Sequence, residues 1–368
     1  MDMNRTSWHG ANRNSRQDPQ RIDVVYLWVD GSDPRWQARR QLAFSDWTSC
    51  HASSDLALYG NVLGRYRDNG ELRFNLRALE KFFPDHGHIY VVTDGQVPPW
   101  LRNRHGLTVV EHRDLMPSAS LPVFNSGHIE SYIHHIPGLA ERFFYLNDDV
   151  FFGAPVNPSA WFEPQLTVAM EATPVPMLDE PSPKETSLVN AAAISAKWLK
   201  SRYPGYRHDS RVYAHAPRPM LRSAMYELER LAPELFRQLR STVFRSWKVP
   251  PIISDLAIRW MVHVGLAREV SAEPVYISTG DPSADQAFAL LENRFGQIPF
   301  FCINDTCDDA PIDDPRLLRV SNVLKRMLPQ PSFFERMTES FDAGAQRRAA
   351  MSTLLRGQPL AAGQVDFS

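Results

Sequence analysis

The sequence contains few cysteines, no excess of either charge and no long apolar run. Cys50, Cys302 and Cys307 neither form an even set for disulfides nor match the spacing of a zinc site, which favours a reducing compartment. Forty basic residues stand against forty-two acidic ones, giving a formal net charge of −2. Because no basic field covers the chain, nucleic acid is not an expected partner, and any anion site must be local.

A segment for export or membrane insertion is not expected either. Residues 1–20 are polar and lack the apolar core of a signal peptide, so they are predicted to form a disordered leader. The most apolar later segment, residues 256–267, is interrupted by Arg259 and His263 and is too short to span a bilayer. We therefore expect a protein without a transmembrane segment.

The first half of the chain alternates between strand and helix patterns. Four short β-rich runs, each ending in polar or acidic residues, have the composition of buried parallel strands, and they cover residues 22–29, 88–94, 107–112 and 142–149. Residues 67–84 and 126–143 show helical spacing of apolar side chains. This order predicts an α/β fold with a doubly wound, mostly parallel sheet, whose ligands gather beyond the carboxyl ends of the strands.

The second half is organised differently. Residues 154–183 are rich in proline and are expected to form a surface excursion rather than a regular layer, whereas residues 184–270 have a mostly helical pattern. Residues 21–336 are therefore expected to form the folded domain, followed by a polar tail at 337–368.

Acidic residues gather at two predicted strand ends. Asp30 and Asp33 follow the first strand, and Asp148 and Asp149 end the fourth. On a parallel sheet these ends open onto one edge, and hard carboxylate oxygens there suit Mg²⁺ or Mn²⁺ beside a nucleotide diphosphate. The alternative is that these residues cap turns and helices, and Asp33 before Pro34 does have the pattern of a turn.

Arginine and histidine supply candidate anion and proton-transfer groups. Arginine binds phosphate bidentately, and the candidate clamps around the first predicted helix are Arg65, Arg67, Arg73 and Arg77. The alternative is a solvated helix face. Arg245 is isolated among apolar residues, with exposed surface as its default. His215 stands between an aromatic residue and two prolines, a rigid setting that could aim an imidazole for proton transfer, although a structural histidine is the default interpretation.

Four runs of the sequence together resemble, in order, the conserved regions of the Stealth family. They are IDVVYLWVDGSDP, RYRDNGELRFNLRALEKFFPDHGHIYVVTDGQVPPWL, FNSGHIESYIHHIPGLAERFFYLNDDVFFG, and HAPRPM followed by FR. FFCINDT and PSFFE also look like the family's C-terminal pattern, so the resemblance spans residues 22–336. The family comprises bacterial capsule and exopolysaccharide sugar-phosphate transferases and the catalytic part of the lysosomal-enzyme N-acetylglucosamine-1-phosphotransferase.

The resemblance implies a Rossmann-like fold and a phosphotransferase activity. A hexose 1-phosphate or N-acetylhexosamine 1-phosphate would pass from a UDP-sugar to a sugar hydroxyl, forming a phosphodiester and releasing UMP in capsule or exopolysaccharide synthesis. The cofactor would be Mg²⁺ or Mn²⁺, held by Asp149 with Asp148 beside it. The catalytic histidine and arginine would be His215 and Arg245, and the general base either His215 or Asp30.

The family pattern also suggests further residues around the substrate. The expected substrate-binding residues are Gly31, Asp33, Arg65, Arg67, Asn69, Arg73, Arg77, Ser126 and Asn147. One position departs from the pattern, because the first acidic residue after Arg245 is delayed to Asp255, which puts the role of Asp255 in doubt.

Two other functions fit the same motifs. A metal-dependent glycosyltransferase would use the same Asp-Asp pair but release UDP, and a catalytically inactive relative would only bind carbohydrate. For a transferase of either kind, the expected partners are a nucleotide-sugar donor and a saccharide acceptor. The resemblance to the bacterial members further implies a cytoplasmic location, at the inner face of the cell membrane and beside a polysaccharide export complex.

Overall fold

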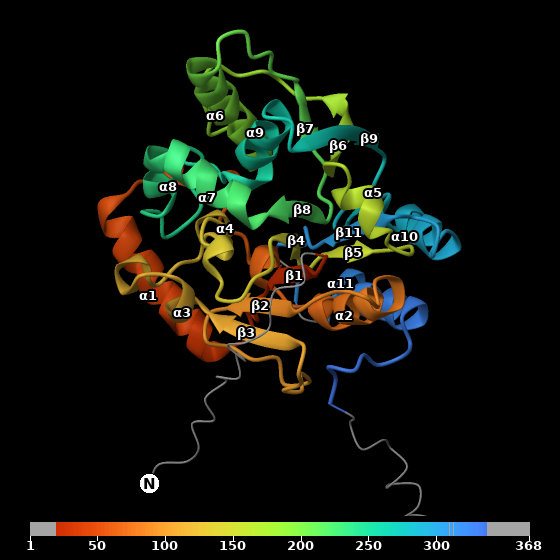
Figure 1. Cartoon of the computed structure of the whole chain (residues 1–368). Coiled ribbons are helices and arrows are strands. Elements are labelled where there is room, and N and C mark those ends of the chain that lie inside the picture. The colour runs from red at the N-terminus through yellow and green to blue at the C-terminus, as the bar shows by residue number, and fades with distance from the viewer. Residues whose placement is uncertain (1–19, 309, 312, 337–368) are drawn as a thin grey trace, which may run out of the picture.

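A mostly parallel five-stranded sheet forms the centre of the computed structural model, which describes residues 20–308, 310–311 and 313–336 (Figure 1). The strand order is β3-β2-β1-β4-β8. The strands are β1 (Ile22–Leu27), β2 (Ile89–Thr93), β3 (Leu107–Glu111), β4 (Arg142–Asn147) and β8 (Arg218–Leu221). The first four run parallel, and β8 adds antiparallel to the edge of β4. The predicted α/β class with a mostly parallel sheet is thus confirmed.

The strands form where the sequence is apolar on both faces. Val24 and Val25 of β1 and Phe143 and Phe144 of β4 have no exposed surface, as expected for a sheet covered on both sides. The predicted first helix is α2 (Glu71–Phe82), which begins after Gly70 in the left-handed conformation. The second predicted helix is shorter than expected, because α4 (Ser126–Glu130) ends at Ser131 and is followed by the 3₁₀ helix η4 (Ile133–His135), after which come Pro137 and Gly138, the latter in the left-handed conformation.

Two three-stranded sheets extend the central one. The first contains β10 (Val275–Ser278), β11 (Phe300–Asn304) and β5 (Val150–Phe152), and the second contains β7 (Arg211–Tyr213), β6 (Leu166–Pro174) and β9 (Ala267–Ala272). Strand β6 lies inside the proline-rich segment 154–183, which was expected to lack a regular layer. This expectation was wrong for β6, because Leu166, Val168 and Met170 alternate with more exposed residues and bury one face of a strand.

Helices and turns complete the fold. Residues 184–270 contain helices, as predicted, but also three strands. The remaining α-helices are α1 (Pro34–Cys50), α3 (His112–Leu115), α5 (Pro158–Phe162), α6 (Ser187–Arg202), α7 (Arg222–Leu231), α8 (Pro233–Leu239), α9 (Ile258–His263), α10 (Ala284–Asn293) and α11 (Pro315–Met327). The 3₁₀ helices are η1 (Ser53–Asp55), η2 (Leu63–Tyr66) and η3 (Ser118–Ser120), and η5 (Ile253–Ala257) is a π-helix.

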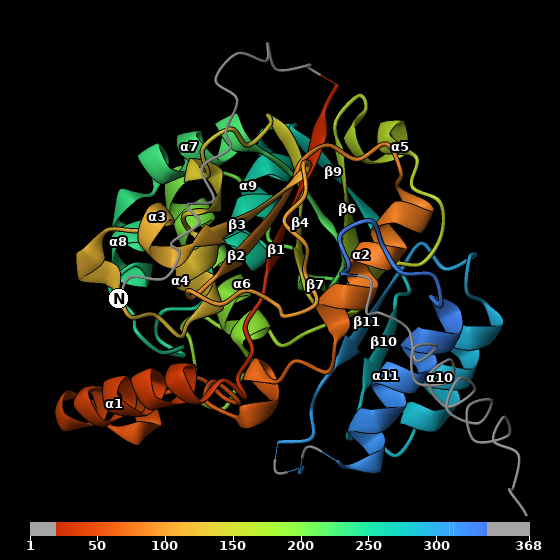
Figure 2. The same ribbon diagram turned by 90° about the horizontal axis from the view of Figure 1, so that it is seen from below.

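Figure 2 shows α1 on one side of the sheet, and α10 and α11 together on another. Among the described residues, none of the helices has the length and apolar character needed to cross a membrane. The predicted leader, apart from Gln20, and the predicted tail at 337–368 lie outside the described residues.

Candidate active site

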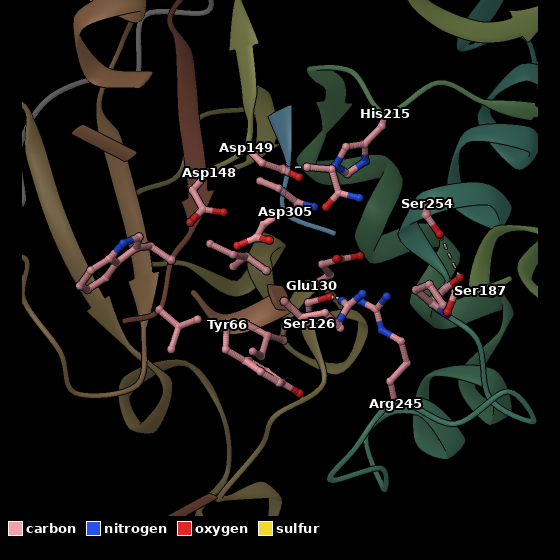
Figure 3. A pocket seen from close by; sticks show the side chains of 18 of the residues that line it. Tyr66, Ser126, Glu130, Asp148, Asp149, Ser187, His215, Arg245, Ser254 and Asp305 are labelled. Carbon is pink, nitrogen blue, oxygen red and sulfur yellow. Dashed lines mark hydrogen bonds and ion pairs between the residues drawn. The ribbon is translucent and has the colours of Figure 1, made fainter. Parts of the chain in front are cut away.

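A cavity of about 490 Å³ opens beyond the carboxyl ends of β1, β2 and β4. Eight of the predicted site residues line it, namely Arg65, Arg67, Ser126, Asn147, Asp148, Asp149, His215 and Arg245. They come from segments far apart in the chain, and Figure 3 shows the labelled side chains of Asp149, His215 and Arg245 around one space. The sheet edge expected from the strand pattern therefore does carry a cavity with acidic and basic groups.

Asp148 and Asp149 occupy the turn between β4 and β5. The buried side chain of Asn75 holds this turn, because its Nδ2 donates to the carbonyl oxygens of Asp148 at 3.0 Å and Val150 at 2.6 Å. The Asp149 carbonyl oxygen accepts from the amide of Ile303 in β11 at 3.0 Å. The two carboxylates thus stand on a turn whose backbone is fixed from both sides.

His215 reaches Asp149 from the loop before β8. Its Nε2 lies 3.2 Å from Asp149 Oδ1, and the Cys302 thiol lies 3.5 Å from Oδ2 of the same carboxylate. Burial opposes ionisation of Asp149, but the charge and the hydrogen bond of His215 outweigh it and lower the pKa of Asp149. Asp149 is therefore poised as an anion beside the imidazole.

The carboxylates next to Asp149 repel one another. Burial, with the charges of Glu71, Asp149 and Asp68, raises the pKa of Asp148 well above its usual range. Burial and the charge of Asp68 likewise raise the pKa of Glu71 to about 8. A divalent cation would relieve this repulsion, and oxygen ligands are those that Mg²⁺ and Mn²⁺ take. The carboxylates present therefore fit the predicted ion, and Asp148 and Asp149 are the residues that would hold it.

A softer donor set overlaps this acidic turn. Ligand atoms of Asp149, His215 and Cys302 all lie within 4.8 Å of one another. Sulfur is a poor ligand for Mg²⁺ but suits softer ions. A second group with this spacing, His134, His135 and Glu229, lies elsewhere, where both imidazoles hydrogen-bond to Glu229.

Basic groups occupy the part of the cavity near α4. Arg245 donates from Nη2 to Ser126 Oγ, and burial together with the charge of Arg65 lowers the pKa of Arg245 to about 9. Neither Arg245 nor Arg65 forms an ion pair with any described residue. Glu130 is buried nearby, and its Oε1 accepts from the Tyr145 hydroxyl at 2.9 Å. Two guanidinium groups in one cavity favour an anionic ligand.

The predicted residues of the first strand end do not line the cavity. Asp30 accepts from the amide and hydroxyl of Ser32, and Asp33 caps α1. Gly31 donates its amide to the Tyr66 carbonyl at 2.6 Å, and a Cβ there would lie only 2.3 Å from that oxygen. Gly31 therefore holds η2 against the end of β1, and the turn-capping alternative describes Asp30 and Asp33.

Arg73, Arg77 and Asn69 also lie outside the cavity lining. Both arginines bind the buried carboxylate of Glu335 and not an open anion site. Asn69 donates to Glu71 and to Asp305. Helical spacing correctly put the two arginines on one face, but that face packs against a segment more than 250 residues away.

Several cavity residues were not expected from the sequence. Arg218 is buried in β8, and Asp305 binds Arg67, which also donates to two backbone carbonyl oxygens. Arg67, which was predicted to bind an anionic ligand, is therefore already paired with the carboxylate of Asp305. Glu130 also lines the cavity, although no sequence pattern singles it out. No local signal marks these side chains, because their neighbours come from distant segments.

Comparison with known proteins supports the resemblance. Residues 20–43 match the family model of Stealth protein CR1, conserved region 1, and residues 65–170 match that of Stealth protein CR2, conserved region 2. The exopolysaccharide phosphotransferase SCO6023 of Streptomyces coelicolor is 37% identical over 86% of this chain and 52% of its own length. The exopolysaccharide phosphotransferase CpsY of Mycobacterium tuberculosis is 32% identical over 86% of this chain and 58% of its own length.

The chain thus spans about half the length of the curated relatives it matches. Among solved structures, the galactosyltransferase LgtC in complex with donor and acceptor sugar analogues has a TM-score of 0.43 and 8% identity, covering 88% of this chain and 99% of that chain. At this TM-score the likeness carries no functional argument. The two conserved regions and the relatives at more than 30% identity confirm the expected resemblance, and the chain belongs to the Stealth family.

Proposed function

We propose that the chain transfers a sugar 1-phosphate from a UDP-sugar to a saccharide hydroxyl in exopolysaccharide or capsule synthesis, releasing UMP. The observation that carries this proposal is the convergence of Asp149, His215 and Arg245 on one cavity. Membership of the Stealth family and the names of the exopolysaccharide phosphotransferases among its relatives support it. A cavity that combines carboxylates, an imidazole and unpaired guanidinium groups suits phosphoryl transfer.

The proposed reaction exchanges one oxygen bond at the β-phosphorus of the donor for another. The acceptor oxygen bonds to the β-phosphorus of the donor, the bond from that phosphorus to the bridging oxygen breaks, and UMP leaves with the bridging oxygen. The acceptor's proton passes to a base, for which His215 is proposed because Asp30 lies outside the cavity lining. Arg245 and Arg65 would stabilise the charge that develops on the phosphoryl oxygens.

The proposed cofactor is Mg²⁺ or Mn²⁺. Asp148 and Asp149 would hold it, with the remaining positions left for water and the donor phosphates. When bound, the ion supplies positive charge to the pyrophosphate. Burial, together with the charges of the neighbouring carboxylates, raises the pKa of Asp148, and this crowding of acidic groups supports the assignment.

The proposal is tested by product analysis. Purified protein is incubated with UDP-sugars, a saccharide acceptor and Mg²⁺, and the nucleotide released is identified by chromatography while ³¹P NMR detects a phosphodiester. UMP with a phosphodiester is the expected result, and Asp149→Asn should abolish both. UDP as the only nucleotide product would instead establish the glycosyltransferase alternative, whereas carbohydrate binding without either nucleotide would indicate the inactive relative.

We also propose that the enzyme works in the bacterial cytoplasm at the inner face of the membrane, beside an export complex. The support is chemical, because nucleotide sugars are cytoplasmic donors and the product is an exported polymer. Fractionation of cells tests it: the protein should appear in the cytosol and in salt-extractable membrane fractions, and recovery only from the culture medium would contradict it.

A further inference from the structure

Arg218 is a buried arginine without a partner. Its side chain lines the cavity from β8, only 6% of the residue is exposed, and its Nε has no hydrogen-bond acceptor. Within the described part of the chain, no ion pair and no hydrogen bond involves its guanidinium group. The nearest aromatic contact is the Tyr145 ring, whose centroid lies 5.8 Å from Cζ. A buried cation left in this state is costly unless a ligand supplies the missing anion.

Other arginines of similar burial show what a structural role looks like in this protein. Arg259 pairs with Asp255 and donates to the Arg211 carbonyl oxygen. Arg77 pairs with Glu335 and donates to the Leu328 carbonyl oxygen. Each of these side chains has an acceptor for its Nε and for at least one further guanidinium nitrogen. Arg218 differs from them in having no such acceptor, although it is equally buried.

The position of Arg218 points to the ligand. It pairs in register with Tyr145 of β4, the strand that ends in the turn of Asp148 and Asp149, and it follows His215 by three residues. It therefore stands on the wall that carries the carboxylates and the imidazole, in the same cavity as Arg65 and Arg245. A planar guanidinium fork matches two oxygens of one phosphate.

We propose that Arg218 binds the pyrophosphate of the nucleotide-sugar donor and forms, with Arg245, a two-arginine anion subsite. This inference rests on the proposed function for the identity of the anion, but the binding itself is measurable without turnover. An anionic group on the saccharide acceptor is the competing source of negative charge, and the experiment separates the two.

Inorganic pyrophosphate with Mg²⁺ and UDP are the probes, titrated calorimetrically into the wild type, Arg218→Met, Arg218→Lys and the control Arg142→Met. Arg142 lies in the same β4–β8 ladder, half-exposed and outside the cavity, and pairs with Glu163. Loss of a charge-assisted contact predicts roughly 10- to 100-fold weaker binding in Arg218→Met. Arg218→Lys should bind with intermediate affinity, and the control should match the wild type.

Thermal unfolding distinguishes a ligand-binding role of Arg218 from a structural one, because loss of a structural arginine would lower the unfolding temperature of the ligand-free protein. Because the unpartnered charge is removed, the ligand-free Arg218→Met protein should unfold at or above the wild-type temperature, while its stabilisation by pyrophosphate should be lost. Should Arg218→Met not fold, Arg218→Lys still decides the affinity.

Two results would overturn the inference. One is unchanged pyrophosphate and UDP affinity in both Arg218 variants, and a raised KM for the acceptor alone would then assign Arg218 to that substrate. The other is a wild type that binds neither probe. Release of UDP instead of UMP would refute the proposed reaction but not this subsite, because pyrophosphate binding is scored separately.

Discussion

Replacing Arg77 by methionine should cost stability and leave ligand binding intact. Arg77 donates to both oxygens of Glu335, at 2.5 Å and 2.7 Å, and to the Leu328 carbonyl oxygen at 2.7 Å. Its side chain is 8% exposed and that of Glu335 is 1% exposed. Glu335 also accepts from the amide of Ser332, so the pair ties the end of the described chain to α2. The substitution therefore removes the buried cation and leaves the Glu335 carboxylate with only Arg73 and the Ser332 amide.

Breaking a buried ion pair by removing one partner costs about 3–5 kcal/mol. At roughly 2 °C per kcal/mol for a domain of this size, Arg77→Met should lower the unfolding temperature by about 6–10 °C. Arg73 contacts the same carboxylate through one bond and is 33% exposed. Arg73→Met should therefore cost only about 1 kcal/mol.

Urea denaturation of Arg77→Met, Glu335→Gln and the double variant measures the pair directly. The two single losses added together should exceed the loss in the double variant, and the difference gives a coupling energy of about 0.5–3 kcal/mol. Burial opposes ionisation of Glu335, but its bonds from Arg77, Ser332 and Arg73 outweigh it and lower its pKa. The stability that the ionised Glu335 carboxylate contributes is fully present above its unfolded pKa of about 4.5. This stability should be lost as the pH falls through the lowered pKa of Glu335 in the folded protein.

Calorimetric titration with pyrophosphate completes the test, because Arg77 was first interpreted as a phosphate clamp. Its affinity in Arg77→Met should equal that of the wild type, since Arg77 is not part of the cavity lining. A variant that unfolds at the wild-type temperature but binds pyrophosphate weakly would refute the structural role and restore the clamp.

Three further outcomes are expected. His215→Asn should slow turnover by roughly 10²- to 10⁴-fold in steady-state assays and also lower the unfolding temperature, because Asp149 loses its imidazole partner; normal turnover would exclude it as the base. Asp255→Asn leaves the charge of Arg259 buried and should cost about 3–5 kcal/mol in urea denaturation, so an unchanged midpoint would show that the pair is dispensable. Burial lowers the pKa of His112 to about 4, so its contribution to stability is complete above about pH 6.5 and is lost toward pH 4; His112→Asn should show a shallower fall of unfolding temperature with acid, and equal slopes would contradict this.

The parallel sheet was predictable because its cause is local. Each of the first four strands is apolar on both faces and ends in polar residues, a pattern that covered sheets impose on their sequence. The same reasoning located Asp148 and Asp149 at a strand end. It failed for β6, where an alternating run between prolines has the composition of a loop, and it did not foresee that β8 would join the sheet antiparallel at β4.

The side chains around the two aspartates were beyond such reasoning, because long-range packing brings them there. His215 and Asp149 are 66 residues apart, and Arg245 and Ser126 are 119 apart. From residue type and spacing alone, His215 was expected to be a structural histidine and Arg245 an exposed surface residue. The family resemblance alone singled them out as catalytic candidates. For Arg73 the spacing predicted the correct helix face but could not show that Glu335, 262 residues away, covers it.

The ion pairs of the buried arginines distinguish those with a structural role from those available to a ligand. Arg67, Arg77 and Arg259 each hold a carboxylate of the protein, and the fold has already neutralised them. Arg218 and Arg245 line the cavity without an ion pair to a carboxylate, although desolvating a cation is expensive and the buried Glu130 lies in the same lining. A bound state that supplies negative charge would offset this cost. Asp148 and Asp149 on the neighbouring turn present an excess of negative charge. An anionic ligand that carries a cation would therefore place its negative charge at the arginines and the cation at these carboxylates.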